Sequence, residues 1–216
     1  MGGPEMPNRV CFLVDGFNVY HSIVEAIRAA PAPSPSMKWL DFLAFCRSFL
    51  SSIGKDAVLE KVFYFSASAD FRPDKAARHA VLVSALRSTG VEVQLGRFKE
   101  KDVWCPSCQT HFKRHEEKET DVAVAVKLLE LLAVNACDTI VLVTGDTDLA
   151  PAIRTAKVLY PEKRIGVVFP FARHNAELKA LAHGTIRVKA KRYVANQLPN
   201  PVKTADGQVI WKPASW

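Results

Sequence analysis

The stretch VLVTGDTDLAP, at residues 141–151, decides the fold class of this chain of 216 residues. It contains most of an apolar run, Thr139 to Val143, that leads directly into Gly145, Asp146 and Asp148. A short apolar run bounded by turn residues is typical of a strand buried inside a parallel sheet. In open sheets of this kind the binding crevice lies at the carboxyl ends of the strands. The stretch therefore predicts an α/β protein that presents carboxylates at one edge of its sheet.

Outward from this stretch, apolar strands alternate with amphipathic helices along the chain. The run RVCFLV at residues 9–14 ends at Asp15-Gly16 in the same manner. We expect strands at residues 9–14, 58–65, 91–95, 139–143, 164–169 and 186–189, and helices at 18–30, 37–53, 73–88, 121–135, 149–159 and 175–182. Strands separated by helices of this length imply a mostly parallel central sheet with helices on both faces. The fold class is therefore a three-layer, Rossmann-like α/β domain.

The expected domain covers residues 9–192, with a charged, irregular insertion at about 99–119. Residues 193–216 are rich in proline and form a C-terminal tail, in which Trp211 and Trp216 predict packing against the domain.

Composition restricts the class of protein further. The longest apolar runs fall far short of the roughly 20 residues that span a bilayer, so we expect no membrane association. Five cysteines, an odd number, suit the reducing cytoplasm. The net charge of +7 favours a polyanionic partner, although a basic surface without such a partner fits the charge equally well. A homo-oligomer is an option that the sequence leaves open.

Four aspartates can reach the crevice at the strand ends. Asp15 and Asp146 each follow a strand, Asp148 lies two residues further on, and Asp121 falls in the first turn of a helix. Any one of them alone is explained equally well as a turn or N-cap residue. Gathered carboxylates repel one another unless a cation lies between them, and carboxylate oxygens suit Mg²⁺ or Mn²⁺. The set therefore predicts a metal site that could activate water toward a phosphodiester.

Three segments resemble the motifs of one family. VCFLVDGFNVY (residues 10–20) resembles an apolar strand followed by D-G-x-N-x-Y, and EKETDVAVA (117–125) resembles E-K-x-x-D-V-x-x-A. Residues 141–151 resemble an apolar strand followed by S/T-G-D-x-D-[FL]-x-P. Together these motifs resemble the NYN domain family, bacterial type, of the PIN-like nuclease superfamily, and the resemblance covers roughly Arg9 to Val188.

This resemblance implies a PIN-like fold and metal-dependent cleavage of single-stranded RNA. Carried over by position, Asp15, Asp121 and Asp146 are the principal ligands of Mg²⁺ or Mn²⁺, and Asp148 completes the acidic cluster directly or through water. Asn18 orients a ligand or contacts a substrate phosphate. One departure is Glu119, where such motifs often have glycine. Two alternatives stay open: a module that binds RNA or protein without cutting, and a DNA nuclease of related fold.

The insertion carries a possible second metal site and basic side chains. Cys105, Cys108, His111 and His115 have the spacing C-x2-C-x2-H-x3-H, which predicts either a structural zinc site or two reduced thiols in a turn. Basic residues interleaved with aromatic ones suit single-stranded RNA, although a solvated insertion has the same composition. The candidate RNA contacts are Arg72, Lys75, Arg97, Lys99, Lys113, Arg114 and Lys118.

Overall fold

The structure is a computed structural model that describes residues 6–32 and 36–216, and it confirms the predicted α/β class. Seven strands of the described chain form one sheet in the order β4-β3-β2-β1-β5-β6-β7. The parallel strands are β1 (Asn8–Asp15), β2 (Ala57–Ser68), β3 (Glu92–Cys105), β5 (Thr139–Val143), β6 (Arg164–Phe169) and β7 (Gly184–Arg187). Strand β4 (Thr110–Lys118) is antiparallel to β3.

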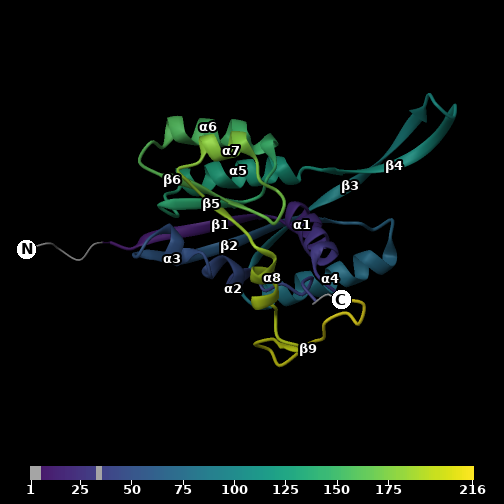
Figure 1. The fold of residues 1–216 in the computed structure, drawn as a ribbon, viewed down its shortest axis with the longest axis horizontal. Coiled ribbons are helices and arrows are strands. Elements are labelled where there is room, and N and C mark those ends of the chain that lie inside the picture. The colour runs from purple at the N-terminus through teal and green to yellow at the C-terminus, as the bar shows by residue number, and fades with distance from the viewer. Residues whose placement is uncertain (1–5, 33–35) are drawn as a thin grey trace, which may run out of the picture.

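Helices cover both faces of the sheet, as the alternation of strands and helices predicted (Figure 1). One face carries α1 (Gly16–Ala29), α2 (Phe42–Arg47), α3 (Leu50–Ile53), α4 (Pro73–Ser88) and α8 (Ala190–Ala195). The other face carries α5 (Thr120–Ala133), α6 (Ala150–Leu159) and α7 (Ala176–Leu181). Both layers are apparent in Figure 1, where the sheet runs between them.

Strand β1 divides two hydrophobic cores. Val10, Phe12 and Val14 belong to the core on the α1 side, whereas Cys11 and Leu13 belong to the core under α5 and α6. Successive side chains of a strand point to opposite faces, so an apolar run without alternation is buried on both sides. This central position fixes where the last residue of the strand, Asp15, must lie.

The insertion at about residues 99–119 is ordered, which corrects the expectation of an irregular segment. Strands β3 and β4 pair from Arg97↔Lys118 to Cys105↔Thr110 and form an arm that projects from the body (Figure 1). The arm has little apolar surface to bury, so its sequence lacks the alternation that marks a strand. Cross-strand charge pairs lie along it, such as Lys113 with Glu100 at 2.5 Å.

The single helix expected at residues 37–53 is also wrong. The side chain of Asp41 accepts a hydrogen bond from the Ala44 amide and caps the start of α2. Before it, Leu40 makes a β-bridge with Gln197, so this segment is held in a non-helical conformation by the C-terminal tail. The last strand of the sheet lies at residues 184–187, two residues earlier than expected.

The tail packs on the domain, as Trp216 predicted. Leu198 and Val202 are buried, and Trp39 donates a hydrogen bond to the Pro199 carbonyl at 3.0 Å. The rings of Trp216 and Trp39 lie 6.3 Å apart. The other tryptophan, Trp211, is 63% exposed and does not anchor the tail. The tail also forms a small hairpin, β8 (Val202–Lys203) with β9 (Val209–Ile210).

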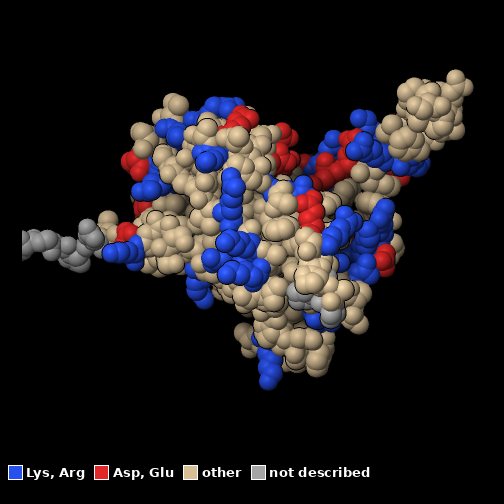
Figure 2. Space-filling model, viewed as in Figure 1, with Lys and Arg blue, Asp and Glu red and all other residues tan. Residues whose placement is uncertain are grey.

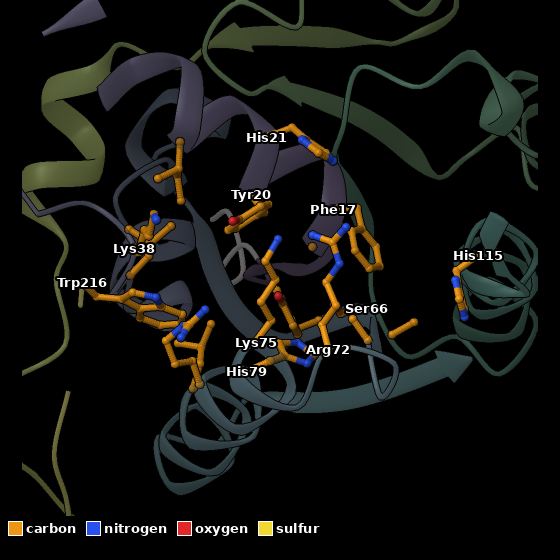
Figure 3. Close-up of a pocket in the computed structure, with 18 of the residues that line it drawn as sticks. Phe17, Tyr20, His21, Lys38, Ser66, Arg72, Lys75, His79, His115 and Trp216 are labelled. Carbon is orange, nitrogen blue, oxygen red and sulfur yellow. The ribbon is translucent and has the colours of Figure 1, made fainter. Parts of the chain in front are cut away.

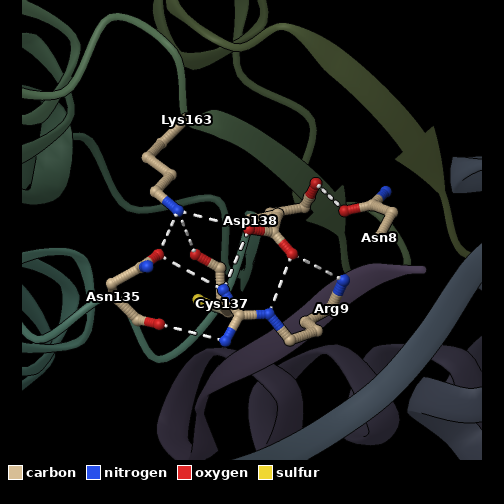
Figure 4. Close-up of polar contacts among 7 residues, drawn as sticks. Asn8, Arg9, Asn135, Cys137, Asp138 and Lys163 are labelled. Carbon is tan, nitrogen blue, oxygen red and sulfur yellow. Dashed lines mark hydrogen bonds and ion pairs between the residues drawn. The ribbon is translucent and has the colours of Figure 1, made fainter. Parts of the chain in front are cut away.

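A polar cluster joins strands at the edge of the sheet where β1 and β5 begin (Figure 4). Asp138, just before β5, accepts hydrogen bonds from the Arg9 side chain at 3.0 Å and from Lys163 at 3.2 Å. Both cations keep the pKa of Asp138 well below its usual range, and the hydrogen bond from Arg9 is the largest cause.

No helix in the described residues is long and apolar enough to cross a bilayer.

Candidate metal centre

The order of the strands brings the first and third motifs together. Strand β1 lies beside β2 on one side and β5 on the other, so the chain proceeds outward from β1 in one direction and from β5 in the other. Between β1 and β5 lies the topological switch point, where a crevice opens at the carboxyl ends of the strands. Val14 pairs with Val143 in register, and Asp15 and Asp146 therefore emerge side by side into that crevice.

Helix α5 brings the third carboxylate. Asp121 lies in the first turn of α5, and one carboxylate oxygen each from Asp15, Asp121 and Asp146 lie within 4.8 Å of one another. Three carboxylates from separate segments are a set of hard oxygen donors, which fits a divalent cation such as Mg²⁺ or Mn²⁺. The predicted triad is thus brought together in space, and these three residues could hold a divalent metal.

Hydrogen bonds fix the orientation of Asp15. Its two carboxylate oxygens accept separately, one from the Asn18 amide at 2.9 Å and the other from the Thr144 hydroxyl at 2.9 Å. The Thr144 oxygen in turn accepts from the Asp146 amide at 3.0 Å. One buried threonine therefore links two of the three carboxylate residues.

Asn18 makes a structural contact beside the triad. Its side-chain oxygen accepts a hydrogen bond from the Gly145 amide at 3.0 Å, so it joins the start of α1 to the loop after β5. In this position it holds two motifs together, and its role toward a ligand or a phosphate stays a prediction.

The motif glycines are required because the backbone is crowded. A β-carbon on Gly145 would lie 2.1 Å from the Arg173 carbonyl oxygen, and one on Gly16 would lie 2.6 Å from the Phe65 carbonyl oxygen. Real β-carbons do not approach backbone atoms so closely. Each glycine thus lets the loop that carries an aspartate lie flat against its neighbour.

The carboxylates raise one another's pKa. Burial raises the pKa of Asp15, which is only 5% exposed, and repulsion from Asp146 adds to the effect, while the Asn18 amide and Thr144 hydroxyl oppose it. Burial raises the pKa of Asp121 to about 6, with repulsion from Asp15, Asp146 and Asp148 as further causes. A bound cation would relieve this repulsion, which agrees with the fit of the donor set.

Glu117 is close enough to the triad to interact with it electrostatically, and it was not among the site residues predicted from the sequence. Burial raises the pKa of Glu117 to about 7, and repulsion from Asp121, Asp15 and Asp146 adds to the effect. Glu117 is the first residue of the second motif, at the base of β4. Its position in that motif could have indicated a role at the site. The direction of its side chain could not be predicted without knowledge of the β3–β4 hairpin.

Glu119 shows why glycine is common at its position. This residue precedes α5 with a φ of 80°, in the left-handed region that glycine adopts most easily. Its carboxylate turns away from the triad and accepts hydrogen bonds from Arg97 at 2.6 and 2.9 Å. Glu119 is not one of the three gathered ligands of the acidic cluster.

Asp148 is not one of the three gathered ligands. It lies in the short 3₁₀ helix η1 (Thr147–Leu149), and its amide donates to an Asp146 carboxylate oxygen at 3.0 Å. Its exposed side chain is close enough to influence Asp121 electrostatically. A role through water stays a prediction.

The four candidate zinc ligands do not come together. Cys105 and Cys108 lie at the turn of the arm, where hydrogen bonds from Thr110 and then Cys105 lower the pKa of Cys108. His111 lies opposite Trp104, and His115 stacks on Phe71 with ring centres 3.7 Å apart. Within the described ranges, no cluster of three or more metal-ligand side chains includes a cysteine or histidine. A structural zinc site at this turn stays a prediction, as does the alternative of two reduced thiols.

The predicted RNA contacts fall into two groups. Arg97 and Lys118 are engaged with Glu119 and Glu116, and Lys99 lies on the exposed arm. Arg72, Lys75, Lys113 and Arg114 line one cavity beside the acidic cluster. Figure 2 shows red carboxylates gathered in the hollow where the arm leaves the body, with blue side chains on the arm and on the face below it. Negative and positive potentials therefore adjoin.

This combination of a parallel sheet, a switch point and an aspartate triad defines a PIN-like α/β domain. Residues 9–189 match the NYN domain family, and the chain belongs to that family.

One solved structure and one protein sequence are similar to this chain. A crystal structure of a protein of unknown function from Vibrio parahaemolyticus superposes with a TM-score of 0.57 at 18% identity, covering 87% of this chain and 97% of that one. This likeness supports the fold. A 6-hydroxy-3-succinoylpyridine 3-monooxygenase, HspA, from Pseudomonas putida is 32% identical over 106 residues, which are 47% of this chain. The match spans only 33% of that relative.

Proposed function

We propose that this protein is a divalent-metal-dependent endoribonuclease that cleaves phosphodiester bonds of single-stranded RNA, and that it acts in the cytoplasm. The observation that carries the proposal is the gathering of Asp15, Asp121 and Asp146 within 4.8 Å in a member of a PIN-like family. The family supports a nuclease, and the basic side chains beside the triad support a nucleic-acid substrate.

The triad and its neighbours divide the work. Asp15, Asp121 and Asp146 would hold Mg²⁺ or Mn²⁺, which when bound supplies charge stabilisation at the scissile phosphate and a more acidic water. Thr144 holds the Asp15 carboxylate in one orientation. Glu117, whose pKa is raised to about 7, can accept a proton near neutral pH from a water that approaches the triad.

The oxygenase activity named for the Pseudomonas relative is not part of this proposal, because two thirds of that protein lies outside the match. Two other functions are outcomes of the same test. A module that only binds would retain RNA without cutting it, and a DNA nuclease would prefer the deoxy strand.

The test incubates protein with labelled single-stranded RNA and the matching DNA, in Mn²⁺ or in EDTA. We expect RNA cleavage in Mn²⁺ alone, lowered at least about 100-fold by Asp146→Asn, since even residues behind the metal ligands contribute 10- to 100-fold. The asparagine side chain would keep an oxygen for the Asp148 amide, so the loop stays folded. Asp206→Asn, on the exposed tail, is the matched control. RNA cleavage that persists undiminished in EDTA or in the Asp146 variant would refute the proposal.

A further inference from the structure

A second cavity adjoins the acidic cluster on the α1 side of the sheet. It has a volume of about 670 Å³ and lies between α1 and α4, with the C-terminal tail at one end and strand β4 at the other. Figure 3 shows Lys38 and Trp216 at the tail end, Phe17 and Arg72 toward the other end, and Tyr20 and Lys75 between them. Cavities of several hundred Å³ accommodate small molecules or single nucleotide units.

The walls carry positive charge only. Six Lys and Arg side chains line the cavity, and no Asp or Glu of the described chain does. Arg78 already pairs with Asp74, and Lys113 with Glu100. Lys38, Arg72 and Lys75 have no acidic partner among the described residues. Several such cations around a concave surface attract an anion with more than one oxygen, and phosphate is the common case.

Flat rings accompany these cations. Tyr20 lies 41% exposed on the wall, and Trp216 is held from behind by Trp39. An exposed ring among cations suits a nucleobase, because every base offers a face for stacking. His79 also lines the cavity, and its Nε2 atom is buried without a hydrogen-bond partner in the described chain. Burial lowers the pKa of His79 and so favours the neutral ring, in which one nitrogen can donate a hydrogen bond and the other can accept one.

The cavity and the acidic cluster share a wall. Gly16 and Phe17, which line the cavity, follow Asp15 directly in the chain. Tyr64, another wall residue, is close enough to Asp15 and Glu117 for their charges to help raise its pKa to about 12, although burial is the larger cause. The acidic cluster and the cavity therefore adjoin at the start of α1.

We propose that this cavity binds a phosphorylated nucleotide, with its phosphate at Arg72 and Lys75 and its base against Tyr20 or Trp216. The ligand is either a free nucleotide or one unit of a single strand. Only the second source rests on the proposed nuclease function.

The test is calorimetric titration in EDTA, so that no cleavage is needed for a result. The probes are adenosine 5′-monophosphate, adenosine, and a single-stranded oligoribonucleotide with or without a 5′-phosphate. We expect the monophosphate to bind at least about 10-fold more tightly than adenosine, because the cations contribute only to the phosphate. If the monophosphate displaces the oligonucleotide, the cavity binds one unit of a single strand. If the monophosphate binds but does not displace the oligonucleotide, the ligand of the cavity is the free nucleotide.

Matched variants assign the site. The double variant Arg72→Ala/Lys75→Ala should weaken monophosphate or oligonucleotide binding at least about 10-fold. Lys55→Ala/Arg87→Ala removes the same charge from exposed positions away from the cavity and should change binding less than about twofold. Tyr20→Ala should weaken binding of the monophosphate. Adenosine should bind to this variant no more tightly than it binds to the wild type.

The proposal is overturned if neither the monophosphate nor the oligonucleotide binds, or if both double variants weaken binding equally. These results are distinct from failure of the nuclease. A protein that binds the monophosphate through Arg72 and Lys75 but cuts nothing keeps this site and loses the endoribonuclease function. If both double variants cut RNA equally well and no probe binds in the cavity, the endoribonuclease function is kept and the nucleotide site is lost.

Discussion

The hydroxyl of Thr144 donates a hydrogen bond to Asp15 at 2.9 Å and accepts one from the Asp146 amide at 3.0 Å. Thr144 is 1% exposed, so water cannot replace either contact. This residue ties the ends of β1 and β5 together through the groups that are proposed to hold the metal.

Removal of the Thr144 hydroxyl should therefore impair the site without emptying it. Thr144→Val keeps the shape but leaves Asp15 free to turn and the Asp146 amide unpaired, and we expect RNA cleavage to fall about 10- to 100-fold. Thr144→Ser keeps the hydroxyl and should retain most of the activity. Equal rates for the Val and Ser variants, measured at saturating Mn²⁺, would show that the hydrogen bond has no part in the reaction.

The crowding at Gly145 predicts a loss of stability. Gly145→Ala places a β-carbon against the backbone of Arg173, and we expect the free energy of unfolding to fall by at least about 2 kcal/mol. Gly184→Ala is the matched control, because no atom of residues 6–32 or 36–216 lies within 4 Å of its added β-carbon. Urea denaturation of both variants measures the difference. A Gly145 variant as stable as the Gly184 variant would show that the loop can move aside.

Repulsion within the triad predicts that a ligand variant is more stable than the wild type when metal is absent. Asp146→Asn removes one of the charges that raise the pKa of Asp15 and Asp121. In EDTA we expect its Tm to rise by roughly 2–5 °C, and added Mn²⁺ should raise the Tm of the wild type but not of this variant. Asp206→Asn should follow the wild type. A metal-induced shift of equal size in all three proteins would place the ion elsewhere.

The Asp138 cluster predicts a dependence of stability on pH. Its folded-state pKa is held below the usual value, so its contribution is complete above the unfolded pKa of about 4 and is lost as the pH falls through the folded pKa. Asp138→Asn should cost about 1 kcal/mol at pH 7, a modest figure because solvent screens a side chain that is 40% exposed.

Denaturation of the wild type and the Asp138 variant between pH 3 and 8 measures this contribution. The difference between them should be constant above about pH 5.5 and should shrink below about pH 4. A difference that grows on acidification would have the wrong sign for a depressed carboxyl pKa.

Much of the site could be predicted because the carboxyl ends of the strands in a parallel sheet lie at the same edge. Two apolar runs that each end in aspartate required Asp15 and Asp146 to meet at one edge, once β1 and β5 were neighbours. Asp121 was a candidate from its place in the first turn of a predicted helix, but such a position can face many directions, and its motif supplied the stronger reason to place it at the metal. The match to the family then agrees with the resemblance.

The arm and Glu117 could not be predicted for a related reason. A charged hairpin with no face to bury carries no hydrophobic alternation, so β4 and the direction of Glu117 were hidden together. Likewise, the non-helical segment before α2 is held by the β-bridge between Leu40 and Gln197, which is far along the chain. Local sequence does not contain such contacts.

Anomalous diffraction from crystals soaked in Mn²⁺ tests the central claim most directly. The claim is that three carboxylates from distant segments share one divalent cation. It predicts a single strong manganese peak within coordination distance, about 2.1–2.4 Å, of oxygens from Asp15, Asp121 and Asp146. A fully soaked crystal with no peak among these residues, or with its only peak at another site, would contradict it.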